Sequence, residues 1–145
     1  MRGSSTGKGK KGKTVLFICV GNACRSIMAE ALTRHYWGDR IKSLSAGVSP
    51  LGCVPPETRL ALEEIGVSPQ GLSSKGLDAV DLGQVDLVVN LSGYHMREQV
   101  ALFKGKLINW YIRDPYGESL GSFSQTRDAI DWLVREKLPK WLEEL

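Results

Sequence analysis

Apolar residues follow two different periods along the chain from Thr14 onward. The continuous apolar run Thr14–Cys19, rich in β-branched and aromatic side chains, predicts a strand that is buried on both faces. From Ser26 to Gly38 the apolar positions recur every three to four residues, which predicts a helix. The chain therefore begins with a strand, a tight loop around Gly21 and a helix.

The same alternation of strand and helix patterns continues to the end of the chain. Three further strands are predicted at residues 41–46, 87–91 and 106–112. Three further helices are predicted at residues 56–65, 93–103 and 124–138. Strands that alternate with helices imply right-handed crossovers and a parallel sheet. The predicted fold class is α/β, a single three-layer domain in which a four-stranded parallel sheet has helices on both faces.

Composition limits the chain to one ordinary domain. With 145 residues, of which 42% are hydrophobic, it can build one sizeable core but not two. Residues 1–13 carry five basic and no acidic side chains, so residues 14–145 hold 14 basic against 16 acidic ones. Because the basic segment has no apolar residue after Met1, we expect a disordered basic tail at 1–13 ahead of a folded domain at 14–145.

The sequence shows no pattern typical of a membrane segment or an export signal. The longest apolar run, Val15–Val20, has six residues, whereas a bilayer-spanning helix needs about twenty. We therefore expect a cytoplasmic protein without a membrane partner, and the tail does not indicate a specific nucleic-acid partner. Three cysteines, an odd number in such a chain, indicate free thiols rather than a disulfide framework.

The loop after the first strand has the features of an anion site. A loop that wraps at a helix start turns successive main-chain N–H groups toward an anion, and the helix dipole adds positive charge. Glycine permits close approach there, and asparagine tolerates left-handed backbone. The predicted phosphate-binding residues are Val20, Gly21, Asn22, Ala23, Cys24, Arg25 and Ser26.

Three side chains could carry the chemistry. Cys19 is the candidate nucleophile, because an anion cradle stabilises a thiolate, the form that attacks. Arg25 can hold two phosphoryl oxygens with its planar guanidinium group. Asp114, which the following proline keeps out of helical conformation, can protonate the leaving oxygen, and Tyr116 can form an aromatic wall. Because ligands bind at the carboxyl ends of strands in open α/β sheets, we expect these loops to face one another across one pocket.

The body of the chain from about Thr14 resembles the low-molecular-weight protein tyrosine phosphatases. The resemblance rests on the loop CVGNACRS, the MAEAL helix that follows it, the Ser45-Ala46-Gly47 turn and the Asp114-Pro115-Tyr116 loop. It implies a flavodoxin-like fold and metal-free hydrolysis of phosphotyrosine-type esters through a phosphocysteine intermediate. In that mechanism Cys19 is the nucleophile, Arg25 the phosphate ligand and Asp114 the general acid, with Asn22 and Ser26 supporting the loop.

The resemblance also implies the partners. We expect no cofactor and no metal, a phosphorylated protein or small phosphate ester as substrate, and a monomer or weak dimer. Ile27 stands where many family phosphatases have proline, and Leu51 stands in a cleft segment that lacks the usual aromatic residue. Phosphotyrosine, phosphoarginine and a small ester therefore remain open as substrates.

Two other functions are compatible with this loop. An arsenate reductase on the same scaffold would use the same thiolate; the thioredoxin-linked members have two further cysteines after the third strand, but residues 91–100 contain none. A reductase here would therefore use an external thiol. The third alternative is a catalytically silent phosphate-binding module, against which the presence of Cys19, Arg25 and Asp114 argues.

The remaining cysteines and histidines receive separate predictions. Cys24 could form a reversible disulfide with Cys19 or could be a small packing residue. Cys53, in a proline-rich loop, is predicted to be a surface thiol. His35 and His95 are predicted to lie on helices away from the facing loops, and their spacing indicates no metal site.

Overall fold

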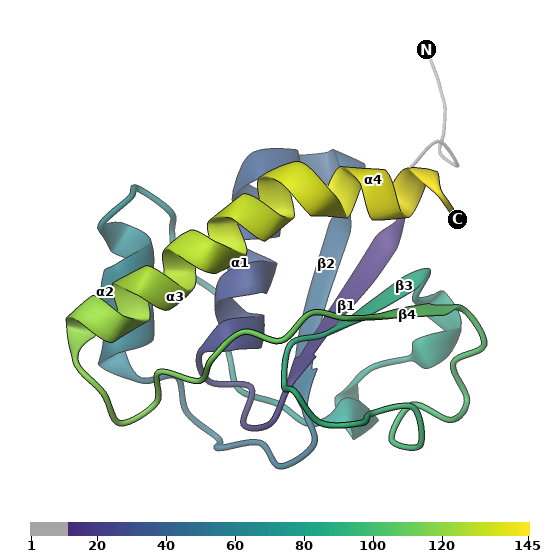
Figure 1. Cartoon of the computed structure of the whole chain (residues 1–145), viewed down its shortest axis with the longest axis horizontal. Helices are drawn as coiled ribbons and strands as arrows, with labels where there is room; N and C mark the ends of the chain where they lie inside the picture. The colour runs from purple at the N-terminus through teal and green to yellow at the C-terminus, as the bar shows by residue number, and fades with distance from the viewer. Residues whose placement is uncertain (1–11) are drawn as a thin grey trace.

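The fold is built on a parallel sheet of four strands in the order β2-β1-β3-β4 (Figure 1). The computed structural model describes residues 12–145, so most of the predicted basic tail lies outside the described residues. The strands are β1 at Thr14–Cys19, β2 at Lys42–Gly47, β3 at Leu87–Asn90 and β4 at Lys106–Asn109. The predicted α/β fold with a four-stranded parallel sheet is confirmed.

Strand β1 has the limits that its apolar run predicts. It lies between β2 and β3, and its residues from Val15 to Ile18 have no exposed surface. Burial on both faces explains why the run is apolar without alternation. The neighbouring strand β2 begins one residue later than predicted and ends at Gly47, which pairs with Cys19.

Four α-helices cover one face of the sheet (Figure 1). They are α1 at Arg25–Trp37, α2 at Pro56–Glu63, α3 at Leu120–Trp132 and α4 at Leu138–Glu143. Fully buried side chains that join helices and strands in one core include Phe17, Ile27, Leu32, Phe123, Ile130 and Leu133. Each such side chain stabilises the fold by about 1.5–3 kcal/mol relative to an exposed position.

The opposite face of the sheet is covered by shorter elements, and the prediction of a helix at 93–103 is wrong. Two 3₁₀ turns, Leu77–Ala79 and Leu82–Gln84, share this face with a series of bends and turns over 92–102. Met96, Val100 and Phe103 still fill the second core cluster. Their spacing of three to four residues therefore places buried side chains in a segment of turns, not in a helix.

Local contacts explain why no helix forms in this segment. Gly93 has a φ of 86°, outside the right-handed helical region. The side chain of Asn90 accepts from the main-chain N–H of Ser92 at 3.0 Å and donates to the carbonyl oxygen of Tyr94 at 2.6 Å. An asparagine that bonds the main chain in this way competes with helical hydrogen bonds.

The last helical segment begins earlier than predicted and is interrupted. Ser119 caps α3 by accepting from Ser122 N, so the helix starts at Leu120. A π-helical stretch, Leu133–Lys137, then connects α3 to α4, with Leu138 N donating to Leu133 O. Pro139 follows at the start of α4. Because proline has no N–H, it disfavours continuous α-helical bonding, and the wider π turn accommodates it.

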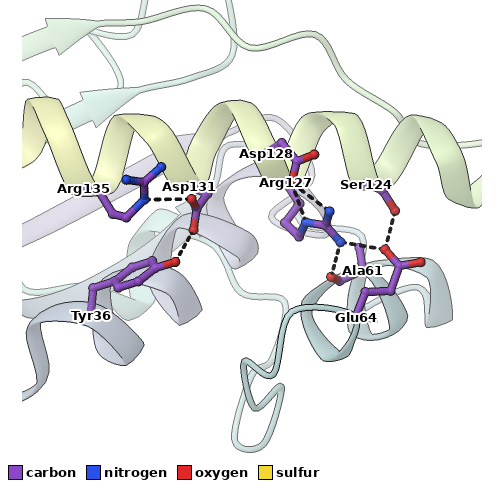
Figure 2. A network of polar contacts seen from close by, with 8 residues as sticks. All are labelled: Tyr36, Ala61, Glu64, Ser124, Arg127, Asp128, Asp131 and Arg135. Atoms are coloured by element: carbon purple, nitrogen blue, oxygen red, sulfur yellow. Dashed lines mark hydrogen bonds and ion pairs between the residues drawn. The ribbon is translucent and has the colours of Figure 1, made fainter.

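Charged side chains fasten α3 to α1 and α2 (Figure 2). Arg127, which is buried, donates to Ala61 O at 2.7 Å and to Glu64 Oε1 at 2.6 Å, both in or next to α2. Asp131 accepts from Tyr36 Oη of α1 at 2.6 Å and from Arg135 Nε at 2.9 Å.

No helix of the described residues combines the length and apolar character needed to cross a membrane.

Candidate active site

The loop from Cys19 to Arg25 connects the end of β1 directly to the start of α1. At its centre Asn22 is buried and has a φ of 47°, the left-handed conformation that the sequence anticipates for this residue. Its side chain donates to Ser26 Oγ at 2.7 Å and accepts from the main-chain N–H of Lys75 at 2.7 Å. Asn22 therefore braces the loop from inside and ties it to a distant segment.

Neighbouring segments hold the outside of the loop through its carbonyl oxygens. The bonds are Ser49 N to Val20 O at 2.9 Å, Leu51 N to Gly21 O at 2.9 Å, Ser74 Oγ to Gly21 O at 3.1 Å and Thr58 Oγ1 to Ala23 O at 2.8 Å. Carbonyl groups that are bonded outward fit a loop whose N–H groups face an anion.

The end of β2 approaches the loop so closely that only glycine fits. A Cβ atom on Gly47 would lie 2.6 Å from Val20 O and 2.8 Å from Asn22 N. Earlier in the same strand, buried Ser45 donates to Glu30 Oε1 at 2.5 Å, and Lys75 Nζ lies 3.7 Å from the same oxygen. The residues Ser45-Ala46-Gly47, predicted as a turn, thus form the end of β2, where Gly47 leaves room for the loop and Ser45 bonds Glu30 of α1.

Ser26 links the candidate nucleophile to this support. The Sγ atom of Cys19 lies 2.9 Å from Ser26 Oγ, and both residues are buried. Because Ser26 Oγ already accepts from Asn22, its hydrogen is available to the sulfur. A hydroxyl donor at this place stabilises a thiolate on Cys19.

Arg25 closes the loop with a guanidinium group whose side chain is 4% exposed. Its Nη1 donates to the carbonyl oxygens of Ile112 at 2.9 Å and Leu91 at 3.2 Å. Its Nε is buried and has no hydrogen-bond partner among the described residues. A buried, fixed cation with an unused donor suits a tetrahedral oxyanion.

Asp114 stands beside Arg25, as the loop pattern predicts. Its Oδ2 lies 3.5 Å from Arg25 Nη2, its Oδ1 accepts from Tyr116 N at 3.0 Å, and its side chain is half exposed. The carboxylate is thereby positioned by its own loop while it stays accessible to a substrate oxygen. A general acid or base needs this combination of fixed position and access.

Most of the predicted residues line one cavity of about 270 Å³, whereas Asn22 and Ser26 are buried behind it and do not line it. Its lining includes Cys19, Arg25 and Asp114, with Leu51 and Tyr116 as half-exposed walls. The structure therefore brings together the candidate nucleophile, the candidate anion ligand and the candidate acid. Their catalytic roles remain predictions.

A second cavity of about 650 Å³ adjoins the first. It shares Val20, Arg25 and Asp114 with the small cavity and is otherwise lined by Val48, Ser92, Tyr94, His95, Met96, Gln99 and Tyr111. The prediction that His95 lies on a helix away from the facing loops is therefore wrong. Without a helix at 93–103, the turn that carries His95 lies next to the site.

The two remaining cysteines differ in environment. Cys24 is buried, and desolvation raises the pKa of its thiol to about 12, although the nearby Thr58 hydroxyl acts in the opposite direction. Cys24 lines the small cavity together with Cys19, and both interpretations of it, as a packing residue and as a disulfide partner, stay predictions. Cys53 is exposed, as predicted for a surface thiol.

Several supporting residues are not predicted from the sequence. Lys75, Ser74, Thr58 and Asn90 bond the loop or the walls of the cavities, but all except Thr58 lie in loops or at a strand end without periodicity. The only sequence signal near them is the Ser45-Ala46-Gly47 turn. Their contribution depends on the tertiary fold.

Known proteins are similar to this chain in both sequence and fold. The family model described as low molecular weight phosphotyrosine protein phosphatase matches residues 14–145. Arsenate reductase 1 of Bacillus cereus (strain ATCC 10987 / NRS 248) is 37% identical over 126 residues, covering 86% of this chain and 92% of the relative. Arsenate reductase 2 of the same strain is 36% identical over 121 residues, covering 81% of this chain and 88% of the relative.

Solved structures agree in fold. An arsenate reductase in its phosphate-binding state has a TM-score of 0.78 at 27% identity, covering 88% of this chain and 98% of that one. An arginine phosphatase from Geobacillus stearothermophilus has a TM-score of 0.80 at 24% identity, covering 91% of this chain and 94% of that one. At that identity the second likeness concerns the fold alone.

Proposed function

The chain belongs to the low molecular weight phosphotyrosine protein phosphatase family, and from this premise we propose that it reduces arsenate with Cys19 as nucleophile. The sequence alone placed phosphotyrosine-type hydrolysis first and arsenate reduction with an external thiol second. The curated relatives with 36–37% identity are arsenate reductases, and they favour the second function. Both functions begin with attack of the same thiolate on a tetrahedral oxyanion.

The observation that supports this chemistry is the position of Cys19 in the small cavity. Its sulfur lies 2.9 Å from a hydroxyl donor and shares the cavity with the fixed guanidinium group of Arg25. Arsenate resembles phosphate in shape and charge, so the same N–H groups and guanidinium would hold it. These donors also stabilise the charge that develops on the oxygens during attack.

The reaction requires two electrons from thiols. The Cys19 thiolate forms a sulfur–arsenic bond, and one arsenate oxygen leaves as water after protonation, with Asp114 as the nearest acid. A second thiol then attacks the Cys19 sulfur; the sulfur–arsenic bond breaks, its electron pair stays on arsenic, and arsenite departs. A further thiol reduces the resulting disulfide and restores Cys19.

The second thiol is proposed to come from outside the chain. Cys24 is buried with a pKa of about 12, and the segment after β3 contains no cysteine. Cys53, although exposed, lines neither of the two cavities at the site. A soluble low-molecular-weight thiol meets the requirement, because it can diffuse to Cys19.

Phosphate ester hydrolysis is the second candidate, and the position of Asp114 favours it. The half-exposed carboxylate shares the cavity with Cys19 and with the walls Leu51 and Tyr116. It can protonate a leaving alcohol and then activate the water that hydrolyses a phosphocysteine. One fold relative is a tyrosine phosphatase of Erwinia amylovora, and an arsenate reductase relative is in a phosphate-binding state.

One experiment separates the two functions. Reduced protein is incubated with arsenate and glutathione, and arsenite is measured; hydrolysis of p-nitrophenyl phosphate is measured in parallel, with Cys19→Ser as control. Arsenite formation that depends on Cys19 and on the thiol supports the reductase. If Cys19-dependent hydrolysis is rapid and no thiol supports arsenite formation, the reductase proposal is wrong and the hydrolase replaces it.

A further inference from the structure

We propose that the large cavity beside the cradle, lined by Tyr94, His95, Gln99 and Tyr111, binds the low-molecular-weight thiol that completes arsenate reduction. This inference rests on the proposed function and assigns the thiol a place on the chain. It concerns the second half of the reaction, after arsenic is bonded to Cys19.

The two cavities meet where the second thiol must act. Val20, Arg25 and Asp114 line both of them, and Val20 directly follows the nucleophile. The small cavity, at about 270 Å³, would hold the oxyanion and its sulfur–arsenic bond. Cys19 itself lines only the small cavity, so a thiol seated in the larger cavity would have to reach the sulfur across the shared Val20–Arg25 edge.

The size of the larger cavity suits a small organic thiol. Its volume of about 650 Å³ falls within the range of about 300–1,000 Å³ typical of small-molecule sites. A protein donor would instead need a complementary outer surface and would leave this cavity without a role. The volume therefore favours a thiol the size of a short peptide.

The wall that carries Tyr94 is fixed by hydrogen bonds although its ring is 68% exposed. Asn90 Oδ1 accepts from Ser92 Oγ at 2.7 Å, and Ser92 Oγ accepts from Tyr94 N at 3.0 Å. A fixed backbone that presents an exposed aromatic ring lowers the entropic cost of gripping a ligand.

The absence of a side chain at Gly93 lets the ring of Tyr111 pack against the main chain. A Cβ atom on Gly93 would lie 2.6 Å from Cδ1 of Tyr111, so the ring of Tyr111 packs directly on this main chain. Tyr111 is 62% exposed, and thus two aromatic rings border one cavity. Such rings offer contact area and hydroxyl groups at low conformational cost.

The charge of the lining indicates the class of thiol. Its charged side chains are Arg25 and Asp114, which face each other at 3.5 Å, so the cavity offers no separate ion-pair partner among the described residues. The remaining polar groups of Tyr94, His95, Gln99 and Tyr111 are hydrogen-bonding groups. They can bond the two amide groups of glutathione, a tripeptide thiol, which serves as the probe.

The step at this site is thiol exchange on sulfur. The bound thiol, as thiolate, attacks the Cys19 sulfur and forms a mixed disulfide, while the electron pair of the sulfur–arsenic bond stays on arsenic. Arsenic is reduced from arsenate to arsenite, and the two sulfurs are oxidised. A second molecule of the same thiol then attacks the mixed disulfide, leaves as a disulfide with the first molecule, and returns Cys19 to the thiolate.

The test compares a thiol that can fill the cavity with one that cannot. Arsenite formation is measured against glutathione and against β-mercaptoethanol for the wild type, Tyr94→Ala and Gln99→Ala, with the exposed Gln70→Ala as matched control. We expect each cavity variant to raise the KM for glutathione about tenfold, the loss of one good hydrogen bond or aromatic contact. The reaction with β-mercaptoethanol and the affinity for inorganic phosphate should stay within about twofold.

Each outcome has a distinct meaning. An unchanged KM for glutathione in Tyr94→Ala and in Gln99→Ala, with reduction intact, would overturn this site alone. Loss of activity toward both thiols together with weaker phosphate binding would also overturn it, because the variants would then have damaged the cradle. Reduction supported only by a thioredoxin-type protein, or abolished by Cys53→Ser, would also overturn the site, because the electrons would then come from a protein thiol and not from a small one. Absence of arsenite with every thiol would instead remove the proposed function.

Discussion

At the scale of single residues, the carboxylate of Asp114 is the group whose role can be tested most directly. It lies 3.5 Å from Arg25 and is half exposed, so an amide in its place keeps the shape and loses the proton. If the second candidate function, phosphate ester hydrolysis, operates, we expect Asp114→Asn to slow its first chemical step about 10²–10⁴-fold for poor leaving groups and far less for good ones. Single-turnover kinetics with a series of aryl phosphates would measure this, and equal rates for poor leaving groups would remove Asp114 from the mechanism.

The hydroxyl of Ser26 has two partners, Cys19 and Asn22. Ser26→Ala should lower the rate of the first step about 10-fold or more, because the thiolate loses its donor, and should cost about 1–3 kcal/mol of stability, because Asn22 loses its acceptor. Thr33 lies on the same helix, and its buried hydroxyl has no partner among the described residues. Thr33→Val is therefore the matched control and should leave both quantities nearly unchanged.

Cys24 and Cys53 should react with alkylating reagents at very different rates. Burial raises the pKa of Cys24 to about 12, so its thiolate is scarce at neutral pH, whereas Cys53 is exposed. We expect iodoacetamide to label Cys53 well before Cys24, and Cys24 only on unfolding, in the Cys19→Ser variant that removes the candidate nucleophile. Peptide mass spectrometry over time would check the order, and early labelling of Cys24 in folded protein would contradict the packing role.

At the scale of secondary-structure elements, buried strands are predicted better than surface covers. From Val15 to Cys19 the run is apolar at every position because both faces of β1 are covered, and its β-branched and aromatic side chains favour a strand. Met96, Val100 and Phe103 have helical spacing, but they cover the sheet from turns that Gly93 and Asn90 impose. Periodicity alone cannot distinguish these cases.

The candidate site is predictable for a related reason. Cys19, Arg25 and Asp114 follow strand ends, and parallel strands bring their carboxyl ends to one edge. Lys75 and Ser74 reach the loop from an irregular segment, and His95 lines the second cavity only because the expected helix is absent. Their placement depends on tertiary contacts that leave no local pattern.

The contact between α2 and α3 should weaken in acid. The hydroxyl of Ser124 and the guanidinium of Arg127 hold the pKa of Glu64 below 4.5 (Figure 2). A carboxyl with a lowered folded-state pKa contributes stability that is full above its unfolded pKa and is lost as the pH falls through the folded value. We expect wild type to be more stable than Glu64→Gln near pH 6, and this advantage to be lost as the pH falls below the ordinary pKa of a glutamate and through the lowered folded-state value.

Urea unfolding over this pH range would measure the difference. Glu63 is the neighbouring glutamate of α2 and makes no ion pair among residues 12–145, so Glu63→Gln is the matched control. A constant stability difference between wild type and Glu64→Gln down to about pH 3 would contradict the assigned contact.

At the scale of the whole molecule, two separate cores meet only through the sheet. One cluster joins the four helices to the sheet, and the other joins the sheet to the turns over 92–102. Strand β1 contributes to both, with Phe17 on one side and Ile18 on the other. The central strand should therefore be the last part of the fold to open.

Hydrogen exchange would measure this order of opening. We expect the amides of β1 to exchange only through global unfolding, whereas β4, an edge strand with half-buried and exposed residues, exchanges through smaller openings. Exchange of β4 as slow as that of β1, at every denaturant concentration, would show that the sheet opens as one unit.

The long reach of Arg25 has a consequence for synthesis of the protein. Its guanidinium group bonds the carbonyl oxygen of Ile112, 87 residues further along the chain. At about 5–20 residues per second, a ribosome needs several seconds to add that stretch after Arg25. During this interval Arg25 lacks the carbonyl oxygens of Leu91 and Ile112 that fix its guanidinium group in the folded protein. The candidate anion site is therefore complete only after the segment that follows β4 has been made.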